Sequence, residues 1–254
     1  MIFKFIPPVK EMNVPPGQVS MANRILLEIE SEGLLKGIEW DLDEGVPGPW
    51  VESREDLAQV IPGILQLVRK ACESSKYDAI IILGGLDPGL YAAKEIGARF
   101  GVPVVGATHS EIVFAYGLGN KYSVIDILDC MAINIRQNIM SYGMNENCAS
   151  VRSIEWSLDA LGTKPPDTAV EAFVQACIKA IEIDGADVIV CGCSCILPMQ
   201  PAAQNRLHQL GYEVPVLHSY KCTIELAKAF VNMKVCQSKL AFPSPTPKTK
   251  SVKR

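Results

Sequence analysis

The sequence predicts an α/β protein made of two similar open parallel sheets that are related by a pseudo-twofold axis, with the functional site in the cleft between them. Short apolar segments alternate with amphipathic segments of helix length, which is the pattern of strands joined by crossover helices. The apolar segments are rich in Val and Ile and lack polar alternation, as parallel strands buried on both faces do. The order of these elements also repeats once along the chain.

Eight apolar segments are predicted to be strands, and they span residues 2–6, 37–41, 79–83, 103–106, 122–127, 149–154, 187–192 and 214–218. Helical periodicity is clearest in residues 57–72, 170–183 and 223–233.

The second half of the chain repeats the pattern of the first. The letters "YDAIIILGGLDPG" and "GADVIVCGCSCILP" each give an acidic residue, an apolar strand and a turn of small residues. Each half continues with a helix, the letters "VPV" and a polar loop that carries a histidine. The repeat aligns Asp78 with Asp187 and Gly84 with Cys193. Ligands bind at the carboxyl ends of parallel strands, so both turns are expected to line one cleft.

The repeat also suggests the domain boundaries. Residues 1–110 with 217–240 are expected to form the first α/β domain, and residues 111–216 the second, each around an open Rossmann-like sheet. Residues 241–254 are rich in Pro, Ser, Thr and Lys, which predicts a disordered tail.

Composition excludes several classes of function. The formal net charge of −4 gives no electrostatic basis for binding nucleic acid or an anionic membrane. No apolar run is long enough to span a bilayer. Nine cysteines without a secretion signal indicate a reducing compartment and free thiols. We therefore expect a cytoplasmic homo-oligomer with a small-molecule substrate and with neither a nucleic-acid nor a membrane partner.

The letters "VIVCGCSCILP" end a strand with three alternating cysteines. Cys193 stands between this strand and the next helix, where the N–H groups and dipole of a helix N-terminus lower a thiol pKa. Cys193 is therefore the candidate acid, base or nucleophile, and the alternative is a buried structural cysteine. Cys191 is predicted to lie in the core, whereas Cys195 could reach the cleft as a second thiol. The spacing does not suit a tetrahedral zinc site, so no metal is expected.

His109 and His218 occupy equivalent positions in the two halves of the repeat. Either could act as a general base or pair with the thiolate of Cys193, and the alternative is a polar loop residue that satisfies main-chain groups. Asp126 follows a predicted strand and could contact N–H groups of a substrate, although a helix cap explains it equally well. Asp87 in "GGLDPG" is predicted to cap the helix that follows it.

Several motifs in order resemble the aspartate/glutamate/hydantoin racemase superfamily, and its hydantoin racemase branch most of all. They are "DPGL", "GVPVVG", "LGNKYSVI", "NCASVR" and "GADVIVCGC", and the resemblance runs from about residue 78 to 230. It implies two α/β domains with a cleft between them. It also implies cofactor-independent chemistry, in which two cysteines act as acid and base on opposite faces of a carbon acid.

The sequence departs from the pattern of this family in three places. The second family cysteine falls on Cys193, but the first falls on Gly84, which cannot carry a proton. The Asn-Pro-Asn-Thr substrate loop of the family is "PPVK" here, so Pro7 and Val9 have replaced polar side chains, and the resemblance implies that Pro8 contacts the substrate. Two acidic pocket residues of the family align with His109 and His218. The loss of one thiol resembles the arylmalonate decarboxylase branch, although the Thr/Ser-rich anion loop of that branch is not matched.

The sequence and the resemblance together predict a cofactor-independent enzyme that acts on a hydantoin-type cyclic ureide or a related small amide or carboxylic acid. Three reactions remain open: racemisation by a Cys–His pair, a lyase or decarboxylase reaction with one proton donor, and hydrolysis at a ring carbon, for example with release of sulfur. A non-catalytic ligand-binding homologue is the fourth reading. The residues expected to bind substrate, in part through main-chain N–H groups that stabilise an oxyanion, are Pro8, Gly84, Gly85, Asp126, Gly192 and Ser194.

Overall fold

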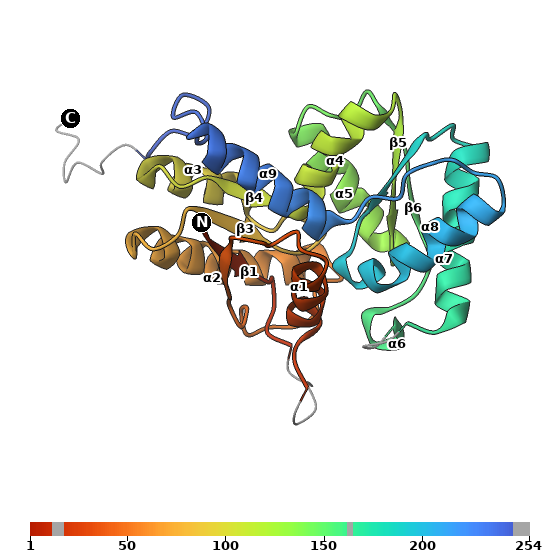
Figure 1. The fold of residues 1–254 in the computed structure, drawn as a ribbon, viewed down its shortest axis with the longest axis horizontal. Helices are drawn as coiled ribbons and strands as arrows, with labels where there is room; N and C mark the ends of the chain where they lie inside the picture. The colour runs from red at the N-terminus through yellow and green to blue at the C-terminus, as the bar shows by residue number, and fades with distance from the viewer. Residues whose placement is uncertain (12–17, 162–164, 246–254) are drawn as a thin grey trace, which may run out of the picture.

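The computed structural model describes residues 1–11, 18–161 and 165–245, and it contains two parallel sheets (Figure 1). The first sheet has the strand order β2-β1-β3-β4, and the second has the order β6-β5-β7. Every strand pair in both sheets is parallel. The predicted α/β class with parallel sheets is therefore confirmed.

The strands are β1 (Ile2–Ile6), β2 (Glu39–Leu42), β3 (Ala79–Ile82), β4 (Val104–Gly106), β5 (Tyr122–Asp126), β6 (Cys148–Ser153) and β7 (Val188–Cys191). Every residue of β3, β5 and β7 is buried, because helices cover both faces of each sheet. This burial explains why their sequences show unbroken apolar runs.

The helices are α1 (Met21–Ser31), α2 (Arg54–Glu73), α3 (Leu90–Phe100), α4 (Ala107–Leu118), α5 (Asp129–Ser141), α6 (Leu158–Leu161), α7 (Asp167–Glu182), the 3-10 helix η1 (Ser194–Met199), α8 (Gln200–Gln209) and α9 (Ser219–Met233). The three segments with the clearest helical periodicity lie in α2, α7 and α9. None of the described helices is both long enough and apolar enough to span a bilayer.

The predicted strand at 214–218 is reduced to a single parallel bridge between Ile189 and Val216. The main-chain N–H of Ile189 donates to the carbonyl of Pro215 at 2.9 Å, and that of Leu217 donates back to Ile189 at 2.8 Å. Pro215 has no N–H of its own, which limits further pairing. The segment lies beside β7 as β4 lies beside β3, so the two sheets have equivalent strand orders.

Glutamine side chains cover the outer edges of these two equivalent segments. The carboxamide of Gln237 accepts from the N–H of Val104 in β4 at 3.1 Å and donates to its carbonyl at 2.9 Å. In the second half, Gln204 accepts from the N–H of Val216 at 2.7 Å, and Gln200 donates to the carbonyl of Val216 at 2.6 Å. Both edge valines therefore have their outward main-chain groups satisfied by side chains.

The acidic residues that open the two repeats play the same part. The carboxylate of Asp78 accepts from the N–H of Ile2 at 2.8 Å, at the start of β1. The carboxylate of Asp187 accepts from the N–H groups of Asn120 and Lys121, both at 2.9 Å, just before β5. Each aspartate thus fixes the start of the strand beside its own, which supports the alignment of the repeat.

The predicted domain boundaries remain a prediction, and the structure shows which elements they cross. The cut between residues 110 and 111 falls inside α4, and α9 contacts α4 as well as β3 and β4 of the first sheet (Figure 1). Of the predicted disordered tail, Phe242 lies among the described residues, and its ring contacts that of Tyr91 edge-on with the centroids 5.7 Å apart. Residues 246–254 lie outside the described residues.

The turns that follow β3 and β7 touch through their main chains. A Cβ atom built on Gly85 would lie 1.4 Å from the carbonyl oxygen of Gly192, so no larger residue fits between the two turns. The hydroxyl of Thr108 also donates to the carbonyl of Gly85, at 2.5 Å. The absence of a side chain at residue 85 therefore sets how closely the two halves approach.

Replacing Gly85 with Ala should destabilise the protein by about 1–3 kcal/mol or more, because the turns must separate to admit a methyl group. Gly117→Ala is the matched control, since a Cβ there meets nothing within 4 Å on an exposed turn of α4. That control should stabilise the helix by roughly 0.5–1 kcal/mol. Urea denaturation followed by circular dichroism measures both, and equal stability of Gly85→Ala and wild type would contradict the contact.

Candidate active site

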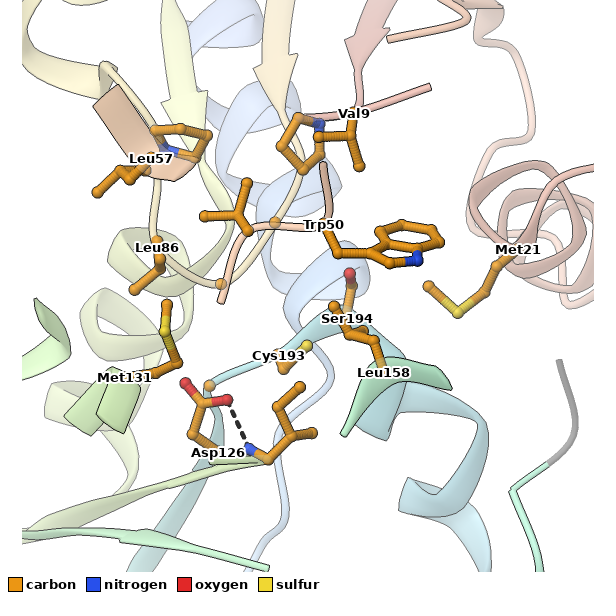
Figure 2. Close-up of a pocket in the computed structure, with 17 residues that line it drawn as sticks. Val9, Met21, Trp50, Leu57, Leu86, Asp126, Met131, Leu158, Cys193 and Ser194 are labelled. Carbon is orange, nitrogen blue, oxygen red and sulfur yellow. Dashed lines mark hydrogen bonds between the residues drawn. The ribbon is translucent and has the colours of Figure 1, made fainter. Parts of the chain in front are cut away.

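A pocket of about 620 Å³ lies where the carboxyl ends of β1, β3, β5 and β7 meet (Figure 2). Its place is the one where open α/β sheets bind ligands. Its lining consists of Pro8, Val9, Met21, Trp50, Val51, Leu57, Gly84, Gly85, Leu86, Pro88, Asp126, Ile127, Met131, Leu158, Gly192, Cys193 and Ser194. The structure therefore brings together Cys193 and all six residues expected to bind substrate.

The wall from the first domain carries no titratable side chain among the described residues that line the pocket. Gly84 has a φ of 100°, which only glycine adopts without cost. A Cβ built on Gly84 would lie 3.0 Å from Cγ of Pro8, so the proline ring covers the space above this turn. This side of the pocket offers apolar surface and main-chain groups.

Cys193 lies in the opposite wall, between β7 and the 3-10 helix η1, and is partly exposed. The expected α-helix does not follow it directly, because α8 begins only at Gln200. Its Sγ is 2.6 Å from Sγ of Cys195, which is 3% exposed. Burial, with the neighbouring Cys193, raises the pKa of the Cys195 thiol well above its usual range. Of these two sulfurs, that of Cys193 faces the pocket.

Cys191 belongs to the core, as predicted. It is fully buried in β7, and its Sγ donates to the carbonyl of Leu217 at 3.1 Å. Its main-chain N–H donates to the buried carboxyl of Glu111 at 3.1 Å. Burial raises the pKa of the Cys191 thiol well above its usual range. This cysteine therefore has a packing role and no route to a ligand in the pocket.

Asp126 ends β5 on the same wall as Cys193 and is only 3% exposed (Figure 2). Burial raises the pKa of its carboxyl to about 7, although the N–H of Ile127, which donates to it at 2.5 Å, lowers it in part. Leu128 is the N-cap of α5, so Asp126 does not cap that helix. The second wall thus holds a thiol and a carboxyl group that exchanges a proton near neutral pH.

The main-chain donors of the two turns are not all available. The N–H of Gly192 donates to the carbonyl of Ile125 at 2.7 Å, so it cannot also donate to a ligand as expected. Among the described residues, no protein acceptor is found for the N–H groups of Gly84, Gly85 or Cys193. The candidate oxyanion donors are therefore fewer than the sequence predicted.

The histidines do not reach Cys193, because neither lines this pocket. The main-chain N–H of His109 donates to the carboxylate of Asp87 at 2.7 Å, and burial lowers the pKa of its ring to about 3. His218 is the N-cap of α9, where its Nδ1 accepts from the N–H of Lys221 at 3.5 Å. Burial lowers the pKa of His218 to about 4. His109 is the third residue of α4 and follows "VPV" by five residues, whereas His218 follows "VPV" by two residues as the N-cap of α9.

Asp87 caps a different helix from the one predicted. The N-cap of α3 is Gly89, whereas the carboxylate of Asp87 accepts from the N–H groups of Thr108 and His109 at the start of α4, at 3.1 and 2.7 Å. The hydroxyl of Tyr142 donates to it as well, at 2.7 Å. Burial raises the pKa of Asp87 to about 6. The turn beneath the pocket is thereby anchored to α4.

Two further features were missed by sequence reasoning. Most of the apolar lining, including Trp50 and Leu158, comes from loops and helix ends, where no periodicity marks it. Tyr220 and Ser194 both line an adjoining, more polar pocket that shares Pro8 and Trp50 with the first. An aromatic residue in the Pro- and Gly-rich loop "VPGPW" was the available signal for Trp50.

No group of three or more His, Cys, Asp or Glu side chains in the described part of the chain is arranged to hold a metal ion.

The chain is similar to known proteins over most of its length. It is 29% identical over 190 residues to a hydantoin racemase of Pseudomonas sp. (strain NS671), which covers 75% of this chain and 72% of that protein. It is 28% identical over 200 residues to a hydantoin racemase of Rhizobium meliloti, covering 76% and 77%. An allantoin racemase structure from Klebsiella pneumoniae superposes with a TM-score of 0.79 at 24% identity, covering 99% of this chain and 96% of that chain.

A family model described as Asp/Glu/Hydantoin racemase matches residues 38–227, which is well over half of the chain and includes the turns at Gly84 and Cys193. The chain belongs to the Asp/Glu/hydantoin racemase family.

Proposed function

We propose that this protein is a cofactor-independent enzyme that moves a proton at the carbon next to a carbonyl group of a hydantoin-type ring, with Cys193 as the acid or base. The observation that carries the proposal is the partly exposed thiol of Cys193 in a pocket at the carboxyl ends of both sheets. The names of the similar proteins, hydantoin and allantoin racemases, support this substrate class.

The pocket supplies the other groups that such a reaction needs. A carbanion next to a carbonyl places negative charge on the carbonyl oxygen, which main-chain N–H groups at Gly85 and Cys193 can stabilise. Protonated Asp126 donates a hydrogen bond, and its ionised form accepts one from a ring N–H. The apolar walls formed by Trp50, Leu57 and neighbouring side chains suit an apolar substituent on the ring carbon.

The two walls differ in a way that bears on stereochemistry. Cys193 and Asp126 both lie in the second wall, because β5 and β7 are adjacent strands in register at Ile125 and Cys191. The first wall offers Gly84 beneath the ring of Pro8. With proton carriers on one face only, the site exchanges the ring proton of one enantiomer. Full racemisation then requires the ring to turn over in the pocket.

The same asymmetry favours decarboxylation of a malonate-type acid as a second candidate function. One carboxylate leaves as carbon dioxide, and its bonding electrons remain on the α-carbon. Cys193 then donates its proton to that carbon from one face. This reaction needs a single proton donor and an apolar environment for the departing carboxylate. The wall formed by the first domain provides the apolar environment.

The decisive assay follows each pure enantiomer of 5-benzylhydantoin, and separately of allantoin, in D2O with a buffer blank. Proton NMR reports exchange at the ring carbon, and chiral chromatography reports inversion. We expect one enantiomer of 5-benzylhydantoin to exchange its ring proton faster than the other enantiomer. The same enantiomer should also exchange faster than either enantiomer of allantoin. Phenylmalonate in the same assay tests the second candidate. No change in any of these substrates would refute both functions.

Cys193→Ala should lower the rate of exchange by between about a hundredfold and ten-thousandfold, the usual contribution of a positioned acid or base. Cys148→Ala is the matched control, since that thiol lies on β6 outside the pocket of Cys193 and donates to the carbonyl of Ser150 at 3.6 Å. Both variants should keep the circular dichroism spectrum of the wild type. Full activity of Cys193→Ala would remove the thiol from the mechanism.

A cysteine at residue 84 should add a proton carrier to the first wall only if Pro8 is also made smaller. Gly84→Cys alone places a Cβ at positive φ and 3.0 Å from Pro8, so we expect it to lose about 1 kcal/mol or more of stability. The double variant Gly84→Cys/Pro8→Ala relieves the contact. It should show new proton exchange on the slower enantiomer, measured as above. An unchanged ratio between enantiomers would show that residue 84 does not face the reacting carbon.

Asp126→Asn should change how stability depends on pH. The pKa of about 7 in the folded protein lies above the unfolded value near 4, so the native state holds a proton that the unfolded chain has released between these pH values. Stability of the wild type therefore falls as pH rises through this window, by up to about 1.4 kcal/mol per pH unit from this group. The variant cannot titrate, so its urea midpoint should fall less between pH 5 and 7. Parallel pH slopes would show that Asp126 ionises normally.

A further inference from the structure

A second cavity lies in the first domain, between α3, β4, α4, α9 and the segment that follows α9. It spans about 440 Å³, including space that is open to solvent, and shares no lining residue with the pocket of Cys193. Its walls are mainly apolar and include Val105, Leu226 and Phe230. Lys94 and His109 also line it. A mainly apolar lining with a few polar groups is typical of a small-molecule site.

Lys94 is a buried cation without a carboxylate partner. Its side chain is 6% exposed, and no Asp or Glu oxygen among the described residues lies within 4 Å of its Nζ. The Nζ lies 5.4 Å from the ring centre of Tyr91 and 5.6 Å from that of Phe242. Burial lowers the pKa of Lys94 to about 8, and the charge of Asp87 opposes this shift, so the amine remains largely charged at pH 7.

The polar groups that line this cavity offer more hydrogen-bond donors than acceptors. Nε2 of His109 lies 3.4 Å from Nζ of Lys94, and a lysine can only donate, so Nε2 accepts and the ring hydrogen is on Nδ1. This Nδ1 is buried without an acceptor among the described residues. The carboxamide of Gln237 is already engaged at both atoms by Val104. The ammonium group of Lys94 therefore keeps N–H bonds that an anion would satisfy.

The geometry points to a binding site for a small monocarboxylate with an apolar body of about six carbons, whose carboxylate pairs with Nζ of Lys94 while its chain packs against Leu226 and Phe230. A neutral apolar molecule would leave the charge of Lys94 unpaired, which is costly in a buried site. A phosphate dianion would bring more charge than this one cation balances, in a wall that is otherwise apolar.

Isothermal titration with hexanoate tests the site directly, with hexanol and hexylamine as ligands of equal length. Hexanoate should bind saturably at one site per chain. Its affinity should exceed that of hexanol and of hexylamine by at least about tenfold, a difference of about 1.4 kcal/mol in binding free energy. Lys94→Met keeps the length of the side chain and removes its charge. It should weaken hexanoate binding at least about tenfold and leave hexanol binding unchanged.

Two further variants make the result independent of the proposed catalytic function. Cys193→Ala should bind hexanoate as the wild type does, because the two pockets share no residue. Leu226→Trp should block binding by filling the cavity, and it replaces Lys94→Met if that variant fails to fold. The site is overturned if hexanoate does not saturate below about 10 mM, if Lys94→Met binds it normally, or if Cys193→Ala abolishes binding.

Discussion

The close main-chain contact between Gly85 and the carbonyl of Gly192 limits how far apart the two sheets can lie. It joins the turn after β3 to the turn after β7, so the carboxyl ends of both sheets are held at one separation. The pocket of Cys193 is the space that remains beside this contact. Because Asp87 ties the first turn to α4, the contact also couples the floor of the pocket to the helix that links the two sheets.

Burial, more than pairing of opposite charges, determines the protonation of the groups near the cleft. Asp126 retains its proton close to neutral pH because it is desolvated, and the rings of His109 and His218 remain neutral for the same reason. The charges at the site are therefore few, and they lie on one wall. A site of this kind depends on main-chain N–H groups and on the exclusion of water to stabilise developing charge.

Much of this architecture could be predicted from the sequence, because parallel strands buried on both faces leave unbroken Val and Ile runs such as "AIII" in β3. The thiol that lines the pocket could be located as well, since the repeat and the family motifs place Cys193 at a strand end. The histidines were misplaced because sequence similarity between the repeats carries no information about which way a side chain leaves the first turn of a helix. Trp50 and Leu158 were missed because loop residues reach the pocket through tertiary packing, which has no periodic signature.

The glutamines beside Val104 and Val216 have a consequence for assembly. An exposed strand edge with free N–H and C=O groups can recruit a strand from another chain, which leads to sheet extension or to aggregation. At these two equivalent edges, carboxamide groups take the place that a neighbouring strand would occupy. At Val104 and Val216, these edges therefore offer no free pair of main-chain groups to a strand of another chain.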